Sequence, residues 1–189
     1  GSLYGAMSIR ELPLSDTKGI FLRSPGVKVD WRPFAYLSNH VDIRSATART
    51  MTLARIPAFK PVPDTGEPLL PDLDIDVAKL QVDRFIFEPA VAGERQEARI
   101  TGKVAIADRR AQVTANAETV GGKAKGDKLA LILDAVPETN RLSIDMNINA
   151  PQGGVLAAMG GFKEPLTAKL SGKGDWKVWN GTLTGNLGS

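Results

Sequence analysis

Apolar and polar residues alternate along most of this chain, and this alternation restricts its fold more than any other feature. The segments 99–106, 111–118 and 142–149 each carry an apolar or small residue at every second position. Successive side chains of a β-strand point to opposite faces, so each segment predicts a strand with one apolar and one polar face. A sheet with a single apolar face is typical of antiparallel pairing. The sequence therefore predicts an all-β protein with an antiparallel sheet.

Turn-forming residues separate the alternating segments. They lie at 24–26, 107–110, 120–123 and 137–140. Near the C-terminus, Asn180 and Gly181 stand between two apolar runs. A type I′ turn needs positive φ at both central residues, which Asn-Gly tolerates well. We therefore predict a hairpin turn there, with Val178 opposite Leu183.

Two segments have the composition of short helices. Residues 33–38 begin with Pro33, which suits the first position of a helix. Residues 151–159 have apolar side chains at helical spacing and are followed by Gly160 and Gly161, which are typical of a helix end. We expect one or two short helices beside the sheet.

A proline-rich segment divides the chain. Prolines occupy positions 57, 61, 63, 68 and 71. Proline has no backbone donor for a sheet ladder, so this segment is not a central strand. We predict an N-terminal β segment over 3–57, a linker over 58–71 and a C-terminal β segment over 72–187.

Charge and composition argue against several classes of function. The formal net charge is +3, the basic residues are scattered, and Arg109-Arg110 is their only adjacent pair. Nucleic-acid binding requires a clustered basic surface, so we expect no nucleic-acid partner. The chain has no cysteine, which excludes disulfides and thiol chemistry.

The polar residues do not form a recognisable catalytic or metal-binding motif. Asp72, Asp74 and Asp76 alternate, as on a solvated strand face, and lack the glycine and distal glutamate of a calcium loop. His40 is the single histidine, and no nucleophile motif accompanies it. We expect no enzyme activity, no catalytic residue, no metal and no cofactor.

The apolar faces of the predicted strands are the remaining candidate site. Their residues are Ile100, Val104, Ile106, Val113, Leu129, Leu131, Leu133, Leu142, Ile144, Met146, Ile148, Leu166, Leu170, Trp176 and Val178. Two such faces covering each other would form a sandwich core, whereas a single curved sheet would offer its face to a ligand. Small inward residues, such as Ala115 and Gly102, and an aromatic content of only 6% favour the open form.

Motifs in the N-terminal half resemble a known family. Residues 14–22 have Asp and Gly at the turn of a hairpin, residues 27–33 lead to Trp-Arg-Pro, and a short helix, a strand and Arg55-Ile56-Pro57 follow. In the C-terminal half, residues 150–156, 170–175 and 179–181 are similar to the family's glycine-rich units that end in a tryptophan hairpin. In this order the motifs resemble the TamB family of the bacterial translocation and assembly module, within the AsmA-like, repeating β-groove proteins. Asp175 departs from the family pattern, where proline or an apolar residue is common.

The resemblance implies an elongated, curved antiparallel sheet, called a β-taco or β-groove, with an apolar concave face. Such a groove would shield phospholipid acyl chains in transit between the inner and outer membranes. The resemblance further implies a periplasmic location and a parent protein anchored in the inner membrane, with the anchor outside this piece. Gly1-Ser2 is interpreted as a remnant of an expression tag.

A second function agrees with the same resemblance. The molecule would be a scaffold for protein secretion and outer-membrane biogenesis that works with a TamA-like outer-membrane partner. Client outer-membrane proteins would then add a strand to an open sheet edge by β-augmentation. The sequence leaves the lipid conduit and the scaffold as alternatives.

Overall fold

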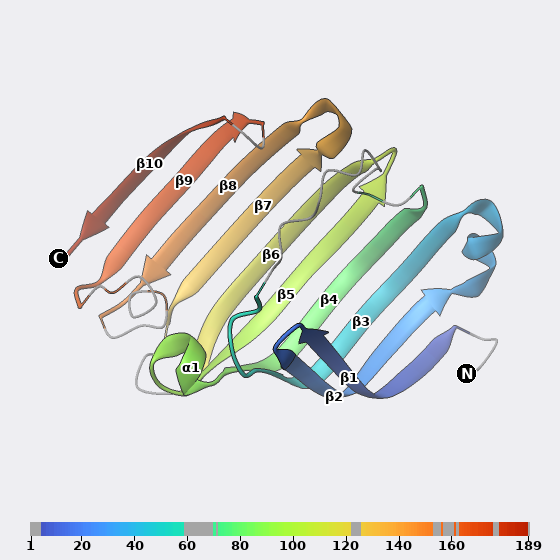
Figure 1. Ribbon diagram of the computed structural model, residues 1–189, viewed down its shortest axis with the longest axis horizontal. Coiled ribbons are helices and arrows are strands. Elements are labelled where there is room, and N and C mark those ends of the chain that lie inside the picture. The colour runs from blue at the N-terminus through green and yellow to red at the C-terminus, as the bar shows by residue number, and fades with distance from the viewer. Residues whose placement is uncertain are drawn as a thin grey trace.

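The described residues of the protein fold into one curved ten-stranded sheet, with short helical turns at its rims (Figure 1). The computed structural model describes residues 5–58, 70, 72–121, 126–152, 156, 161, 163–175 and 178–188. The strands are β1 (Ala6–Asp16), β2 (Gly19–Arg32), β3 (His40–Leu53), β4 (Asp74–Phe87), β5 (Gln96–Ala107), β6 (Arg110–Gly121), β7 (Lys128–Val136), β8 (Arg141–Ala150), β9 (Leu166–Gly174) and β10 (Trp179–Leu187). The helical turns are η1 (Pro33–Ser38), α1 (Pro89–Ala92) and η2 (Pro137–Thr139).

Strand order in the sheet follows strand order in the sequence, from β1 to β10. Every neighbouring pair is antiparallel except β3 and β4, which are parallel. The all-antiparallel expectation is therefore wrong at this one pair. Residues 54–73 join the two strands, and a parallel partner requires a long connection of this kind because the chain must return to the starting end. The two predicted β segments thus lie side by side in one sheet.

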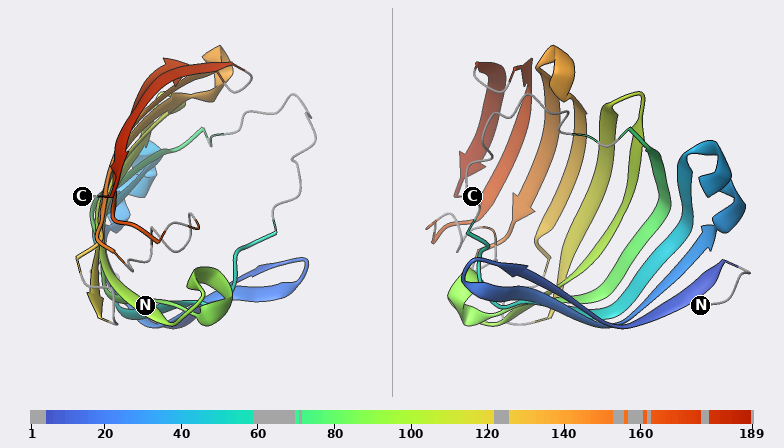
Figure 2. Two further views of the ribbon diagram at one scale, coloured as in Figure 1. Left: turned by 90° about the vertical axis from the view of Figure 1, so that its left-hand side faces the viewer. Right: turned by 45° about the vertical axis from the view of Figure 1, so that its right-hand side comes forward.

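The sheet is bent into an open trough. β1 and β10 form its two edges, and within the described residues they do not pair with each other. Figure 2 shows α1 and the far end of the β1–β2 hairpin on the hollow side. The predicted class, an all-β curved sheet with a few short helices, is confirmed.

Register keeps apolar and small residues on the hollow face across the whole sheet. One continuous row of paired residues runs through all ten strands: Met7, Val29, Ala46, Leu80, Gly102, Ala115, Leu131, Met146, Leu170 and Leu183. A second row of paired residues on the same face begins at Ile9 and Val27 and ends at Ala168 and Gly185. Because side chains alternate, this register places the intervening polar residues on the outer face.

The hollow face is best packed at its N-terminal end. Val27, Val29, Ala48 and Val82 form a buried cluster, against which Trp31 and Phe85 pack among other half-buried side chains. Figure 2 shows that β1 and β2 curl back over this end of the sheet. The trough therefore has a core at β1–β5, while β6–β9 present their apolar side with less cover.

Ion pairs connect neighbouring strands on the outer face. They include Arg23–Glu11, Arg44–Asp30, Arg32–Asp42, Arg84–Glu97 and Arg110–Asp134. Exposed pairs of this kind contribute little stability, at most about 1 kcal/mol each. They do oppose register slips, because a shift of one residue would turn these charges toward the hollow face.

Several predicted local features are confirmed. Residues 33–38 form the 3-10 helix η1 with Pro33 at its start. The turn between β5 and β6 is built by Asp108 and Arg109, with φ of 50° and 57°, between the paired Ala107 and Arg110. Positive φ at two central residues is the signature of a type I′ hairpin. The short helix α1 was not predicted.

Other predictions need correction or lie outside the described residues. Residues 24–26 do not end a strand: β2 runs through them, with Ser24 paired with Leu12 and Pro25 with Glu11. Gly26 has φ of 71°, so this turn-like tripeptide distorts the strand instead of ending it. Of the predicted helix over 151–159 the structure describes residues 151, 152 and 156, and Leu156 is helical. Most of the predicted linker over 58–71, and residues 122–125, lie outside the described residues.

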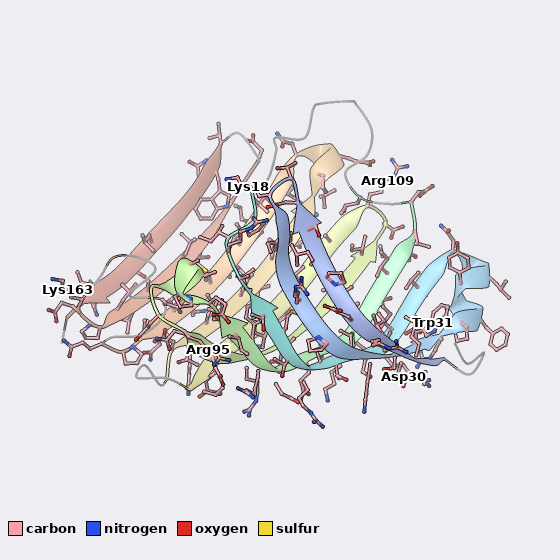
Figure 3. The ribbon with its side chains drawn as sticks, turned by 60° about the horizontal axis from the view of Figure 1, so that its bottom comes forward. Lys18, Asp30, Trp31, Arg95, Arg109 and Lys163 are labelled. Carbon is pink, nitrogen blue, oxygen red and sulfur yellow. The ribbon has the colours of Figure 1, made fainter. Side chains whose placement is uncertain are left out.

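A single carboxylate ties the tip of the β1–β2 hairpin to the segment that follows β3. Arg55 donates to both oxygens of Asp16, at 2.5 and 2.7 Å, and to the carbonyl oxygen of Gly19. The backbone N–H groups of Lys18 and Ala58 also donate to the Asp16 carboxylate, each at 2.7 Å. Figure 3 shows Lys18 at this hairpin tip. Hydrogen bonds from Arg55 first, and then from Ala58 and Lys18, hold the pKa of Asp16 well below its usual range.

We predict that Asp16→Asn destabilises the protein at neutral pH and less so in acid. A carboxyl whose pKa is lower in the folded state stabilises the fold above its unfolded pKa of about 3.9, and this contribution is lost as pH falls. Urea unfolding from pH 7 to pH 2.5 should show the gap between parent and variant narrowing below about pH 4. Glu11→Gln, which removes the exposed pair with Arg23, is the control and should change stability little. A gap that stays constant with pH would contradict the assigned role.

Candidate functional site

The structure brings most of the predicted site residues together on the hollow face of β5–β9. Thirteen of them lie on successive rows of paired residues. They are Ile100, Val104, Ile106, Val113, Leu129, Leu131, Leu133, Leu142, Ile144, Met146, Ile148, Leu166 and Leu170. We call this set the apolar face.

Most side chains of the apolar face are only half-buried. Leu142 is buried, while the other twelve keep part of their surface open. The described residues form a single sheet, so no second sheet covers this face as it would in a sandwich. At one end, Val91 and Ala92 of α1 are buried. A broad apolar surface without a covering layer is typical of a binding site.

Side-chain size varies across the apolar face in a regular way. β6 contributes three alanines, at 111, 115 and 117, and one larger residue, Val113. Its neighbours carry mostly larger side chains: isoleucine and valine on β5, interrupted by Gly102 opposite Ala115, and Leu129, Leu131 and Leu133 on β7. Strands lie about 4.8 Å apart, so β5 and β7 are separated by roughly 10 Å. Ala115 and Ala117 of β6 therefore form a low strip beside the larger side chains of β7, and Val113 closes the strip at one end.

Trp179 marks the far end of the apolar face. It pairs with Gly174, and its indole lies over Gly172 and Gly181. A Cβ atom at Gly172 would lie 2.5 Å from Cζ2 of this ring, and one at Gly181 would overlap the ring. The two glycines thus provide a flat surface for the indole, whose Nε1 is buried without a hydrogen-bond partner among the described residues. Sequence reasoning did not place Trp179 on this face.

The predicted Asn180-Gly181 turn is wrong. Both residues lie inside β10, paired with Lys173 and Gly172, and Leu183 is opposite Leu170. The chain turns earlier, where the backbone N–H of Asp175 donates to the carbonyl oxygen of Val178 at 2.9 Å. Pairing along nine residues of β9 outweighs the turn preference of one dipeptide, and glycine at 181 is needed beneath the indole.

One predicted site residue, Val178, does not lie on the apolar face. Val178 precedes β10 and is exposed, with its N–H donating to the Asp175 side chain. Trp176 lies outside the described residues. The mistaken turn placed both of them in a strand, which is why the sequence assigned them to the site.

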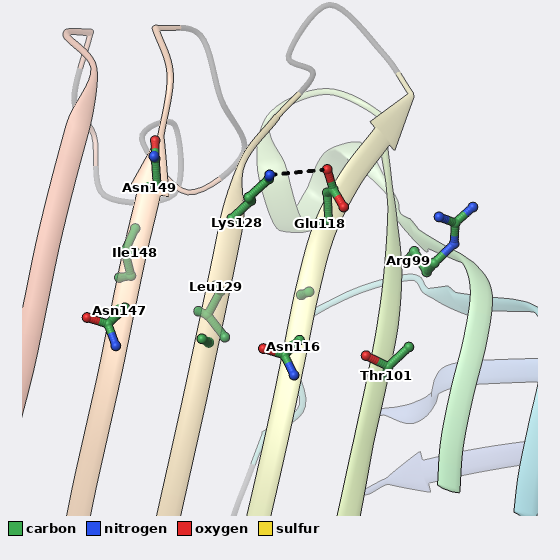
Figure 4. A pocket seen from close by; sticks show the side chains of 11 residues that line it. Arg99, Thr101, Asn116, Glu118, Lys128, Leu129, Asn147, Ile148 and Asn149 are labelled. Atoms are coloured by element: carbon green, nitrogen blue, oxygen red, sulfur yellow. Dashed lines mark ion pairs between the residues drawn. The ribbon is translucent and has the colours of Figure 1, made fainter.

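The outer face has a hollow of its own, of about 390 Å³, over β5–β8 near the start of β7 and the end of β8 (Figure 4). Asn116 and Asn147 lie on either side of the small Ala130, because all three belong to one row of paired residues. Glu118 and Lys128 pair at 3.8 Å beside them. Amides, charges and a hydroxyl line this hollow, so it forms part of the hydrated face of the sheet.

Of the polar residues singled out in the sequence, His40 and Asp76 contact each other. His40 Nε2 lies 2.8 Å from Asp76 Oδ2, while the nearby Ser38 hydroxyl donates to the carbonyl oxygen of Ala35. Among the described residues, no group of histidine and acidic side chains is placed to hold a metal ion. No helix in the described part of the chain is long and apolar enough to cross a membrane.

Comparison of the chain with protein-family models, curated proteins and solved structures gives no match. The candidate function therefore depends on the geometry of the apolar face.

We predict that Gly181→Ala displaces the Trp179 indole. Added at position 181, a methyl group would occupy the space of the ring, so the ring must leave its glycine surface. In a Trp31→Phe, Trp176→Phe background, Trp179 fluorescence should shift to longer wavelength as water reaches the ring. Thr182→Ala, on the outer face of the same strand, is the control and should leave the emission unchanged. Identical spectra for Gly181→Ala and its parent would contradict the assigned packing.

Proposed function

We propose that this protein binds the acyl chains of phospholipids on its apolar face and shields them from water. The observation that carries the proposal is the continuous apolar face of β5–β9, which is half-buried and which no second sheet of the described residues covers. The driving force is hydrophobic: each CH₂ group removed from water contributes about 0.8 kcal/mol. An acyl chain of some 15 carbons has ample apolar surface for such a site.

The strip of alanines on β6 supports a particular placement of the acyl chain. At Ala117, larger side chains of β5 and β7 stand on both sides of the strip, and the spacing of roughly 10 Å between these strands suits one extended hydrocarbon chain. The acyl chain would run along β6 over Ala117 and contact Ile100 and Leu129 on its two flanks. In this position it touches aliphatic carbon on three sides.

The composition of the apolar face also supports movement of the ligand. The thirteen side chains are aliphatic apart from the thioether of Met146, and none offers a charged group or a strong hydrogen-bond donor. Contacts of similar energy at each position along β6 would let an acyl chain slide without a large barrier. This is the property required of a conduit between two membranes, the role implied by the family resemblance.

The scaffold alternative depends on the sheet edges. β-augmentation would use the open backbone of β1 or β10, whereas lipid binding would use the side chains of β5–β7. Variants of the apolar face therefore separate the two functions. A TamA-like partner and outer-membrane clients belong to this alternative.

We predict that Leu131→Lys abolishes lipid binding while Ile132→Lys preserves it. The two residues are neighbours on β7 and point to opposite faces, and Ile132 is 56% exposed on the outer face. A lysine at 131 would bring a charge into the acyl-chain path. Photo-cross-linking to a diazirine-labelled phosphatidylethanolamine, followed by mass spectrometry, measures binding in each variant.

Circular dichroism and thermal unfolding control for the fold in the same experiment. The proposal expects both lysine variants to fold, and only Ile132→Lys to cross-link as the parent does. Unfolding of Leu131→Lys alone would mean that the apolar face is a closed core. Equal cross-linking of the two variants would mean that lipid does not bind on this face.

A further inference from the structure

The two edges of the sheet differ in how they are protected against pairing with other strands. β1 contains Arg10, Glu11 and Pro13, and its register with β2 shifts between Leu14 and Ser15. Charges, proline and bulges are the usual devices that keep an edge strand from binding another strand. β10 has none of them: its nine residues are uncharged, lack proline and pair with β9 without a register shift.

The sequence of β10 is also symmetric about its centre. From Asn180 to Asn186 it reads Asn-Gly-Thr-Leu-Thr-Gly-Asn, which is the same in both directions around Leu183. Two antiparallel copies of a strand run in opposite directions, so a palindromic strand meets an identical sequence in a second copy. Such a contact is isologous and closes with twofold symmetry.

The backbone of β10 is oriented for this contact. The N–H of Gly188 donates to the carbonyl oxygen of Pro165 at 3.0 Å, and the N–H of Asp175 to that of Val178 at 2.9 Å. These bonds place the even-numbered positions of this strand in hydrogen-bonded pairs with β9. The backbone N–H and C=O groups of successive residues point alternately to one neighbour and to the other in an antiparallel strand. Within the described residues, the N–H and C=O groups that point away from β9 therefore belong to the odd-numbered residues, including Gly181, Leu183 and Gly185.

We propose that β10 pairs antiparallel with β10 of a second copy of this chain, with Leu183 on the twofold axis. In this register Leu183 meets Leu183 of the other copy, Gly181 meets Gly185, and Trp179 meets Leu187. All of these are odd-numbered, so their outward backbone groups face one another. In this register the outward backbone groups of the two strands can form hydrogen bonds, and the facing side chains can contact each other.

Side-chain exposure supports the same register. Leu183 is 70% exposed and Leu187 is 56% exposed in the single chain, both on the hollow side with Trp179. Pairing places the two copies of Leu183 side by side and each Leu187 next to the indole of the other copy. On the outer face, Thr182 meets Thr184 and Asn180 meets Asn186, which are favourable cross-strand pairs.

Pairing at β10 would join two troughs into one. The twofold axis stands perpendicular to the sheet, so both hollow faces open to the same side. The row of paired residues that ends at Leu183 would continue into the same row of the second copy. This inference goes beyond lipid binding and does not depend on it, because it concerns the edge of the sheet alone.

Cysteine cross-linking tests the register directly, since the natural chain contains no cysteine. Residues in a hydrogen-bonded antiparallel pair have Cα atoms about 5.5 Å apart, within the range of a disulfide. Under mild oxidation, Leu183→Cys should form a disulfide-linked dimer. Thr182→Cys and Thr184→Cys should each cross-link poorly alone and efficiently when mixed, because position 182 faces position 184. Leu14→Cys on β1 is the control for random collision.

Sedimentation equilibrium tests the association without a covalent bond. The parent chain should dimerise with rising concentration, and Leu183→Lys should weaken dimerisation at least tenfold by placing two lysines on the axis. Leu37→Lys, at a residue 84% exposed on η1, is the matched control and should dimerise as the parent does. A parent chain that stays monomeric at millimolar concentration overturns the proposal, even if β10 accepts a strand from another protein. Equal cross-linking of Leu183→Cys and Leu14→Cys would also overturn it.

Discussion

The register of backbone pairing is the constraint on which the rest of this structure depends. Side chains of a strand alternate between faces, so one slipped residue would exchange the apolar and polar faces of that strand. Register shifts interrupt the pairing at a few points in β1–β6, yet a row of paired residues runs unbroken from Met7 to Leu183, across the parallel pair β3–β4. The apolar face, the charged outer face and the symmetric edge all follow from this register.

Much of the fold was predictable because its information is local. Alternation identified β5, β6 and β8, and the turn residues identified the hairpin at Asp108-Arg109 and the helix after Pro33. The errors arose where a distant partner outweighed a local preference. Asn180-Gly181 has the composition of a turn, but pairing with β9 and the Trp179 indole keep it in a strand. The parallel pairing of β3 with β4 depends on residues 54–73 as a connection, and periodicity carries no information about such a connection.

The candidate site was predicted in its residues more fully than in its shape. Thirteen of the fifteen residues share the apolar face, since membership of a face follows from alternation. Alternation alone did not show whether a second sheet covers that face. The described residues form one curved sheet, which leaves the face without a second sheet over it. The low strip on β6 likewise depends on which strands are neighbours, because alanines form a depression only where the neighbouring strands carry larger side chains. An open trough thus turns an ordinary strand pattern into a surface with room for a ligand.

The most direct test of the acyl-chain account is methyl NMR of the protein with a lysophospholipid that carries a nitroxide in its acyl chain. A nitroxide broadens nearby resonances, so it reports which methyl groups the acyl chain approaches. The account predicts strong broadening for Ile100, Leu129 and Leu131, which flank β6, and little for Ile132 on the outer face of β7. Equal broadening on both faces, or none at saturating lipid, would contradict the claim that the apolar face binds acyl chains.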